Sequence, residues 1–115
     1  MIDDASSTDL AWLAGLLEGE GVFDLHRDRY PRIRIAMADR DVVERVASLM
    51  GCTVRMSMRE APYTPLWHAE VQGARAEAVM RAVLPYMGAR RSARIARVLA
   101  HSPVTSKTPP RLAAA

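Results

Sequence analysis

The chain has 115 residues, the size of one domain, and half of them are hydrophobic, enough to bury a core. Sixteen Lys and Arg residues against 13 Asp and Glu residues give a net charge of +3. One cysteine excludes a disulfide framework, the three scattered histidines exclude a zinc site of ordinary spacing, and no apolar run is long enough to span a membrane.

The charges are unevenly distributed along the chain. Six acidic residues and no basic residue precede Arg27, whereas seven basic residues and no acidic residue follow Glu77. Fifteen of the 16 basic residues are Arg, which binds phosphate and guanine through paired hydrogen bonds, although a GC-rich genome also produces an Arg excess. Because the segment 1–7 is acidic and polar rather than a targeting signal, we expect an intracellular, cytoplasmic protein.

The first predicted helix begins at an N-cap, Ser7 or Thr8, and ends near Gly19. One of its faces is a narrow stripe of small residues at four-residue spacing (Ala11, Gly15 and Gly19), with Trp12 beside it. Such a stripe allows a second helix to approach closely, so it predicts a dimer interface. Glu18 and Glu20 lie at the end where the helix dipole disfavours negative charge. Either a bound divalent cation compensates them or they are solvated residues beside a glycine cap.

Two strands with alternating polarity follow the first helix. The first covers residues 22–28, with Phe23 and Leu25 inward, and the second covers residues 32–38, with Ile33, Ile35 and Met37 inward. Residues 29–31, which include Pro31, are expected to form the turn between them.

The second half of the chain repeats this order. Asp39 caps an amphipathic helix that stops at Gly51. The third strand, 53–60, has Val54, Met56 and Met58 inward, and a loop over 61–65 leads to the fourth strand, 66–72, with Trp67, Ala69 and Val71 inward. A third helix opens at Gly73, and a fourth covers 89–100 and carries Arg90, Arg91, Arg94 and Arg97.

This element order predicts an α+β domain over residues 7–101, in which helices cover one face of a four-stranded antiparallel sheet. The Pro-, Thr- and Ala-rich tail 102–115 is expected to be disordered. The uncovered sheet face would carry arginines among hydrogen-bonding side chains, a composition that suits a DNA major groove or, alternatively, ordinary solvent. Acidic residues there would repel phosphate, although a carboxylate can accept from cytosine. The candidate DNA-contacting residues on or near this face are Asp24, His26, Arg32, Arg34, Thr53, Arg55, Ser57, Arg59, His68 and Gln72.

Residues 13–21, LAGLLEGEG, resemble the motif that names the LAGLIDADG homing endonuclease family, with five of nine positions identical. The predicted element order is also similar to that of the family. The resemblance implies an αββαββα(α) fold whose motif helices pack side by side, so that two sheets form a saddle over DNA. Because the chain has one motif and no repeat, it implies a homodimer that cuts a long near-palindromic double-stranded site and is encoded with an intron or intein.

The resemblance also assigns site residues. The last acid of the motif, which the family uses as a metal ligand, is Glu20, and the Gly19 carbonyl would be a secondary ligand for Mg²⁺ or Mn²⁺. A basic residue near the cleaved phosphates corresponds to Arg90, with Arg91 beside it as the alternative and as a DNA contact. A position that is commonly polar in the family, often Gln, corresponds to Met37, and methionine cannot orient water.

Three alternatives to an endonuclease are consistent with the sequence. Met37 favours a catalytically inactive relative that binds DNA, whereas the retained Glu20 favours catalysis, because a binder does not need an acid beside phosphates. An RNA-splicing maturase of the same fold is not distinguished by these residues. The last alternative is an unrelated α+β domain.

Overall fold

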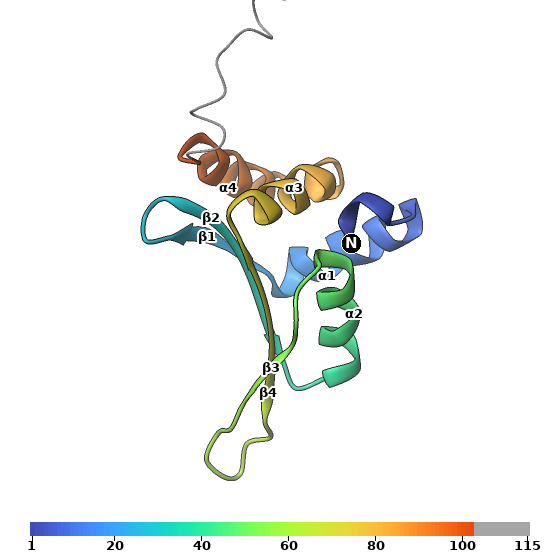
Figure 1. Cartoon of the computed structure of the whole chain (residues 1–115), viewed down its shortest axis with the longest axis vertical. Coiled ribbons are helices and arrows are strands. Elements are labelled where there is room, and N and C mark those ends of the chain that lie inside the picture. The colour runs from blue at the N-terminus through green and yellow to red at the C-terminus, as the bar shows by residue number, and fades with distance from the viewer. Residues whose placement is uncertain (103–115) are drawn as a thin grey trace, which may run out of the picture.

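The computed structural model describes residues 1–102 and contains one antiparallel sheet covered by helices (Figure 1). The predicted class, α+β with four strands and four helices, is confirmed. The tail 103–115 lies outside the described residues. The elements in chain order are η1 (Ile2–Asp4), α1 (Ser7–Glu20), β1 (Val22–His26), β2 (Tyr30–Met37), α2 (Arg40–Met50), β3 (Arg55–Ser57), β4 (Leu66–Gln72), α3 (Gly73–Val83), η2 (Leu84–Tyr86) and α4 (Ala89–Ala100).

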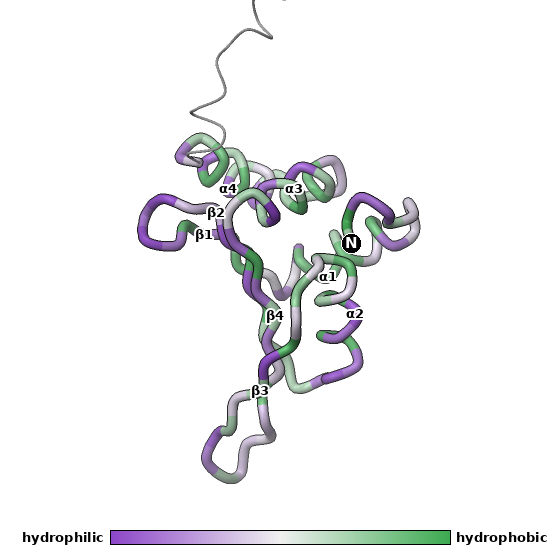
Figure 2. The backbone as a smooth tube through the Cα atoms, in the orientation of Figure 1, coloured by the Kyte–Doolittle hydropathy of each residue, from purple (hydrophilic) through white to green (hydrophobic). Residues whose placement is uncertain are grey.

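The strands are arranged in the order β1-β2-β4-β3. Alternate side chains of β1, β2 and β4 are buried under the helices, including Phe23, Ile33, Ile35, Ala69 and Val71. The core is completed by buried residues from all four helices, such as Leu17, Val46, Met80 and Ile95. The opposite sheet face has no helix over it in the described part of the chain (Figures 1 and 2).

The N-terminus of α1 differs by one residue from the prediction. Ser6, rather than Ser7 or Thr8, is the N-cap, and its side chain accepts a hydrogen bond from the Asp9 N–H at 3.1 Å. The C-cap of α2 is as predicted, because Gly51 adopts a left-handed conformation with φ of 80°. None of the helices in residues 1–102 is long and apolar enough to cross a membrane.

The turn between the first two strands was predicted in the wrong place. It covers residues 27–29, with Arg27 and Asp28 at positive φ (53° and 56°), and Pro31 lies inside β2. Pro31 is tolerated there because β4 pairs with β2 only from Arg32 onward, so the missing N–H breaks no bond on that side.

The third strand is shorter than the predicted 53–60. Only residues 55–57 pair with β4, and the hairpin extends past the helices (Figure 1). Met56 and Met58 were expected inward but are 46% and 71% exposed. The predicted alternation fails here because Met56 lies on the edge strand of the sheet and Met58 lies past the end of that strand.

Ser102 belongs to the folded part of the chain. Its side chain is buried and donates a hydrogen bond of 2.9 Å to Glu77 on α3. Glu77 also pairs with Arg81 at 2.8 Å, so a buried carboxylate fixes the end of the described chain against α3.

Candidate functional site

The C-terminus of α1 places one carboxylate at the uncovered face of the sheet. Glu20, the last residue of α1, is exposed, and it has no hydrogen-bond or ion-pair partner within residues 1–102. Gly21 makes the turn into β1 possible, because a Cβ at this position would meet the Leu17 carbonyl oxygen at 2.8 Å. The chain therefore passes directly from helix to strand, and Glu20 is held at the junction.

The neighbouring acid, Glu18, has a different environment. Its Oε1 accepts a hydrogen bond of 2.6 Å from the backbone N–H of Gly88, the N-cap residue of α4. Arg91 donates from Nε to the Glu18 carbonyl oxygen at 3.0 Å and lies 3.7 Å from its carboxylate. These contacts neutralise the helix end and attach α4 to α1, so Glu18 has a structural role.

Arg91 is correspondingly withdrawn from solvent. Its side chain is only 14% exposed, and its guanidinium lies 5.7 Å from the centre of the Phe23 ring. Arg90, one residue earlier, is exposed and has no hydrogen-bond or ion-pair partner in the described part of the chain. Of the two arginines considered for contact with phosphate, Arg90 is the available one.

The stripe of small residues on α1 faces away from the chain's own core. Ala11, Gly15 and Gly19 are all exposed, and a Cβ on either glycine would have no neighbour within 4 Å among the described residues. A glycine inside a helix destabilises it by roughly 0.5–1 kcal/mol relative to alanine. The folded chain itself therefore gives no reason for these two glycines.

Trp12, predicted in the same interface, is engaged in part within its own chain. It is half-buried against the core, and the Arg45 guanidinium of α2 lies 3.9 Å from its ring centre. Arg45 also approaches Asp9 at 3.4 Å. Trp12 thus connects α1 with α2, and its remaining exposed part borders the stripe.

An open pocket of about 360 Å³ adjoins Glu20 on the uncovered face. His68 in this pocket is hydrogen-bonded through Nε2 to the Ser57 hydroxyl at 2.7 Å. Burial, and then the positive charge of Arg55, lowers the pKa of His68, which keeps its ring neutral at pH 7 and available as a donor or acceptor. The pocket is lined by Glu20, Val22, Arg34, Ile35, Ala36, Arg55, His68, Ala69 and Glu70.

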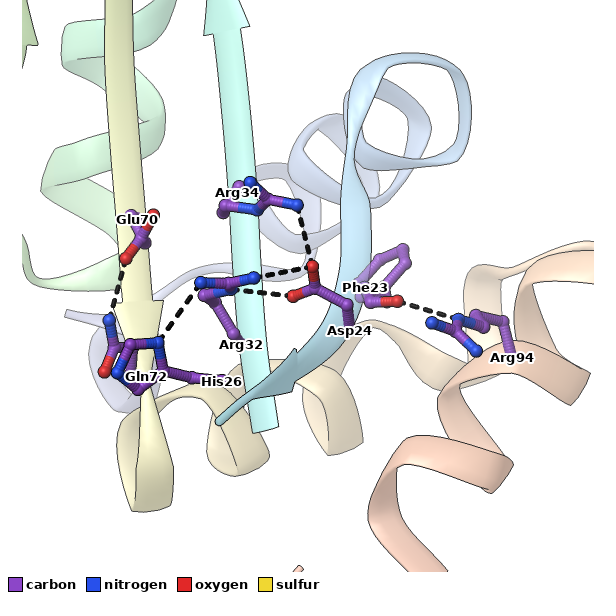
Figure 3. Close-up of polar contacts among 8 residues, drawn as sticks. All are labelled: Phe23, Asp24, His26, Arg32, Arg34, Glu70, Gln72 and Arg94. Carbon is purple, nitrogen blue, oxygen red and sulfur yellow. Dashed lines mark hydrogen bonds and ion pairs between the residues drawn. The ribbon is translucent and has the colours of Figure 1, made fainter. Parts of the chain in front are cut away.

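Asp24 organises a second polar cluster on this face (Figure 3). Arg32, directly opposite on β2, donates from Nε and Nη2 to the two Asp24 oxygens at 2.8 and 2.9 Å. Arg34 donates from Nη2 to Asp24 Oδ2 at 2.7 Å, and Arg32 Nη1 lies 3.2 Å from His26 Nδ1. The hydrogen bonds from Arg32, opposed in part by burial and aided by both positive charges, hold the pKa of Asp24 below its ordinary value.

The remaining predicted DNA-contacting residues lie on β3, on β4 and in the segments on either side of β3. Arg55 and Ser57 lie on β3, and Gln72 on β4 donates to Glu70 at 2.8 Å. Thr53 precedes β3, and Arg59 lies in the loop beyond it, where Nε donates to the Thr64 carbonyl at 2.8 Å. The sheet therefore brings together most of the predicted face, with Thr53 and Arg59 outside the strands.

Met37 lies at the end of β2 on the helix-covered side. It pairs with Trp67 of β4 and packs against the core, away from the face that carries Arg34 and Glu70.

Arg94 is a residue whose role was not predicted individually. Its Nε donates to the Phe23 carbonyl at 2.8 Å, which covers the free edge of β1. A shallow groove between α4 and the start of β1 is lined by Gly21, Val22, Phe23, Arg90, Arg91, Arg94 and Arg97. The run of arginines in α4 was a visible signal, but its position against β1 depends on the tertiary fold.

The described part of one chain contains no complete metal site. Within residues 1–102, no group of three His, Cys, Asp or Glu residues is close enough to hold an ion. Glu20 offers an unpaired hard oxygen ligand, and the Gly19 carbonyl is adjacent to it. These ligand types suit Mg²⁺, which retains several waters and is commonly bound through one or two carboxylates.

Comparisons with known proteins support the fold. No protein-family model matches the chain, and no curated protein matches it. Among solved structures, the homing endonuclease I-CvuI in complex with its target in the presence of 2 mM Ca matches with 18% identity and a TM-score of 0.58, over 77% of this chain and 62% of that one.

Two further structures give the same result. The complex of I-CvuI with the I-CreI target and 2 mM Mg, in which the DNA is not cleaved, matches with 16% identity and a TM-score of 0.59, over 89% of this chain and 68% of that one. The homing endonuclease I-TnaI matches with 16% identity and a TM-score of 0.52, over 77% and 67%. The chain has the fold of these homing endonucleases and spans about two thirds of their length or slightly less.

Proposed function

We propose that this protein is a metal-dependent, site-specific DNA endonuclease of the LAGLIDADG type that acts as a homodimer on a near-palindromic double-stranded site. The observation that carries the proposal is the pairing of two features on one helix. α1 ends in an exposed carboxylate without a partner in the described chain, Glu20, and its exposed face carries two glycines that the chain's own packing does not require.

These features support each other physically. If two α1 helices cross at Ala11, Gly15 and Gly19, the two Glu20 side chains come to the same end of the crossing. Two carboxylates at a helix C-terminus would repel each other and oppose both dipoles, so their presence is reasonable when a divalent cation is bound there. The metal, Mg²⁺ or Mn²⁺, when bound, would lower the pKa of a coordinated water and stabilise the leaving oxygen.

The remaining residues would bind and orient DNA. The uncovered sheet face presents Arg34, Arg55 and the neutral His68 beside Glu20, a mixture of donors and acceptors suited to base edges in the major groove. Arg90, exposed on the first turn of α4, would stabilise negative charge on phosphate but cannot act as a base. Arg91 would support this region through its contact with Glu18 rather than bind DNA.

A second candidate function is DNA binding without cleavage. The apolar environment of Met37 favours it, because the end of β2 has no group there that could orient water. An RNA-splicing maturase would use the same fold, and no observation on these residues favours it.

The proposal is tested by a cleavage selection. The protein is incubated with a large random library of double-stranded DNA, once with Mg²⁺ and once with EDTA, and the cut ends are sequenced. The endonuclease predicts Mg²⁺-dependent ends centred on a near-palindrome. Enrichment of a bound palindrome without cut ends would instead establish the binding relative. If the library shows no cut ends and no enriched sequence, both functions are refuted.

A further inference from the structure

Arg32 and Arg34, the two arginines of β2 that contact Asp24, differ in the number of nitrogens without a hydrogen-bond partner. All three nitrogens of Arg32 have partners: Nε and Nη2 contact Asp24, and Nη1 contacts His26 (Figure 3). Arg34 uses only Nη2, in one bond to Asp24 Oδ2, and its Nε and Nη1 have no partner among residues 1–102. Exposure agrees with this difference, because the Arg34 side chain is 45% exposed and that of Arg32 is 20% exposed.

Asp24 itself has little capacity left. Oδ1 accepts one bond from Arg32, and Oδ2 accepts one from Arg32 and one from Arg34. A carboxylate oxygen offers about two lone pairs, so Oδ2 is saturated. Asp24 is therefore poorly suited to accept from cytosine, and its charge is more than balanced by two guanidinium groups.

Arg34 is held by Asp24 rather than by its direct neighbours across the sheet. Its partner on β1 is Val22, which has no polar side chain, and its partner on β4 is Glu70, which accepts instead from Gln72 at 2.8 Å. The diagonal bond to Asp24 leaves the guanidinium at the open pocket that Glu20 also lines. A free arginine loses rotamer entropy when it is ordered, and the Asp24 bond removes part of that loss before DNA binds.

We propose that Arg34 is the guanine-reading side chain of this face and that Asp24 and Arg32 are positioning residues that hold it. Nη2 carries a second N–H besides the one that Asp24 accepts, so Arg34 still has an adjacent pair of N–H groups, from Nη2 together with Nε or Nη1. Such a pair matches the O6 and N7 acceptors of guanine in the major groove, which is the commonest specific contact of arginine. This inference rests on the proposed function, and it assigns different roles to residues that the sequence placed together as direct DNA contacts.

The experiment compares base preferences after selection of the wild-type binding site. Wild-type protein is expected to require one guanine in each half-site, with a discrimination of about tenfold or more over other bases. Arg34→Ala should abolish that preference, and Asp24→Asn should reduce it to about threefold or less while leaving non-specific affinity equal or higher, because a negative charge is removed. In the Arg34→Ala background, Asp24→Asn should have no further effect on that base.

Two controls keep the outcome interpretable. Glu70→Gln also removes an acid beside Arg34 but breaks no contact with it, so the guanine preference should remain. Replacing the guanine by 7-deazaguanine removes the N7 acceptor and needs no protein variant, and it should weaken wild-type binding about tenfold but not binding by Arg34→Ala. A site without such a guanine, or a preference unaffected by Asp24→Asn, overturns this inference while the proposed function stands; failure of the wild type to select any DNA overturns both.

Discussion

Replacing Gly15 by valine should separate the proposed dimer without unfolding the chain. Gly15 is exposed, and a Cβ there would have no neighbour within 4 Å among the described residues, so the larger side chain creates no clash in one protomer. Valine and glycine differ by only a few tenths of a kcal/mol in helix propensity. The free energy of unfolding of the monomer should therefore change by less than about 0.5 kcal/mol.

The effect on the dimer should be much larger. Overpacking a close contact destabilises it by about 1–3 kcal/mol per site, and twofold symmetry places the substitution at the contact twice. The sum, about 2–6 kcal/mol, weakens the dimer at least about 30-fold.

Sedimentation equilibrium over a concentration series measures this dissociation constant directly. Ala78→Val, at an exposed position of α3 away from the stripe, serves as the matched control and should leave it unchanged. An unchanged constant for Gly15→Val, or a wild-type protein that stays monomeric at every concentration, would show that the stripe is not an interface.

Three further predictions concern the end of α1 and the Asp24 cluster. Gly21→Ala should destabilise the chain by about 1–3 kcal/mol, because the new Cβ meets the Leu17 carbonyl oxygen. Gly19→Ala should stabilise a monomer by up to about 1 kcal/mol, because the space around Gly19 is open. Urea unfolding in which both variants change the free energy of unfolding in the same direction would refute this geometry. Glu18→Ala should lower the free energy of unfolding by about 1–2 kcal/mol, because the hydrogen bond to Gly88 is lost, whereas Glu20→Ala should leave it unchanged. Equal losses of the two variants in thermal unfolding would contradict the different roles assigned to the two acids. Because the folded pKa of Asp24 is lowered, its contribution to stability is complete above the ordinary value of 3.8 and disappears as the pH falls through the lower folded pKa; unfolding measured from about pH 5 to pH 2 should therefore show less acid sensitivity in Asp24→Asn than in wild type, and identical curves would contradict this.

Periodicity predicted the element order well because each helix and most strands bury one face. The helix from residue 89 to 100 and the strand from 66 to 72 have the predicted bounds. The first turn was misplaced because Pro31 is a strong local turn signal, whereas the residues that actually turn, Arg27 and Asp28, give a weak one. Pro31 enters a strand only because its neighbour β4 ends opposite Arg32, which sequence alone does not reveal.

The predicted burial of Met56 and Met58 failed for a similar reason. Alternation identifies two faces of a strand, but it does not show whether another element covers them. β3 is a three-residue edge strand, and Met58 lies beyond its end in the hairpin that extends past the helices, so both methionines stay exposed (Figure 1).

The sequence located the candidate site but did not show which role each of its residues has. The motif indicated two acids at the end of α1, and only the fold shows that Glu18 contacts Gly88, 70 residues away, while Glu20 remains unpaired among residues 1–102. Likewise, alternation placed Arg32 and Arg34 on one face with equal weight. Their difference arises from the cross-strand register, which sets Asp24 directly opposite Arg32 and diagonal to Arg34.

The most direct measurement of the central claim compares wild type with Glu20→Gln on the selected DNA site, with cleavage and binding assayed separately. The substitution keeps the size of the side chain and removes its charge, and Glu20 has no contact in residues 1–102 whose loss would disturb the fold. The account predicts that Mg²⁺-dependent cleavage is abolished while binding, measured in Ca²⁺, stays within a few fold of wild type. Undiminished cleavage, or an equal loss of cleavage and binding, would contradict the assignment of Glu20 as the metal ligand of an endonuclease.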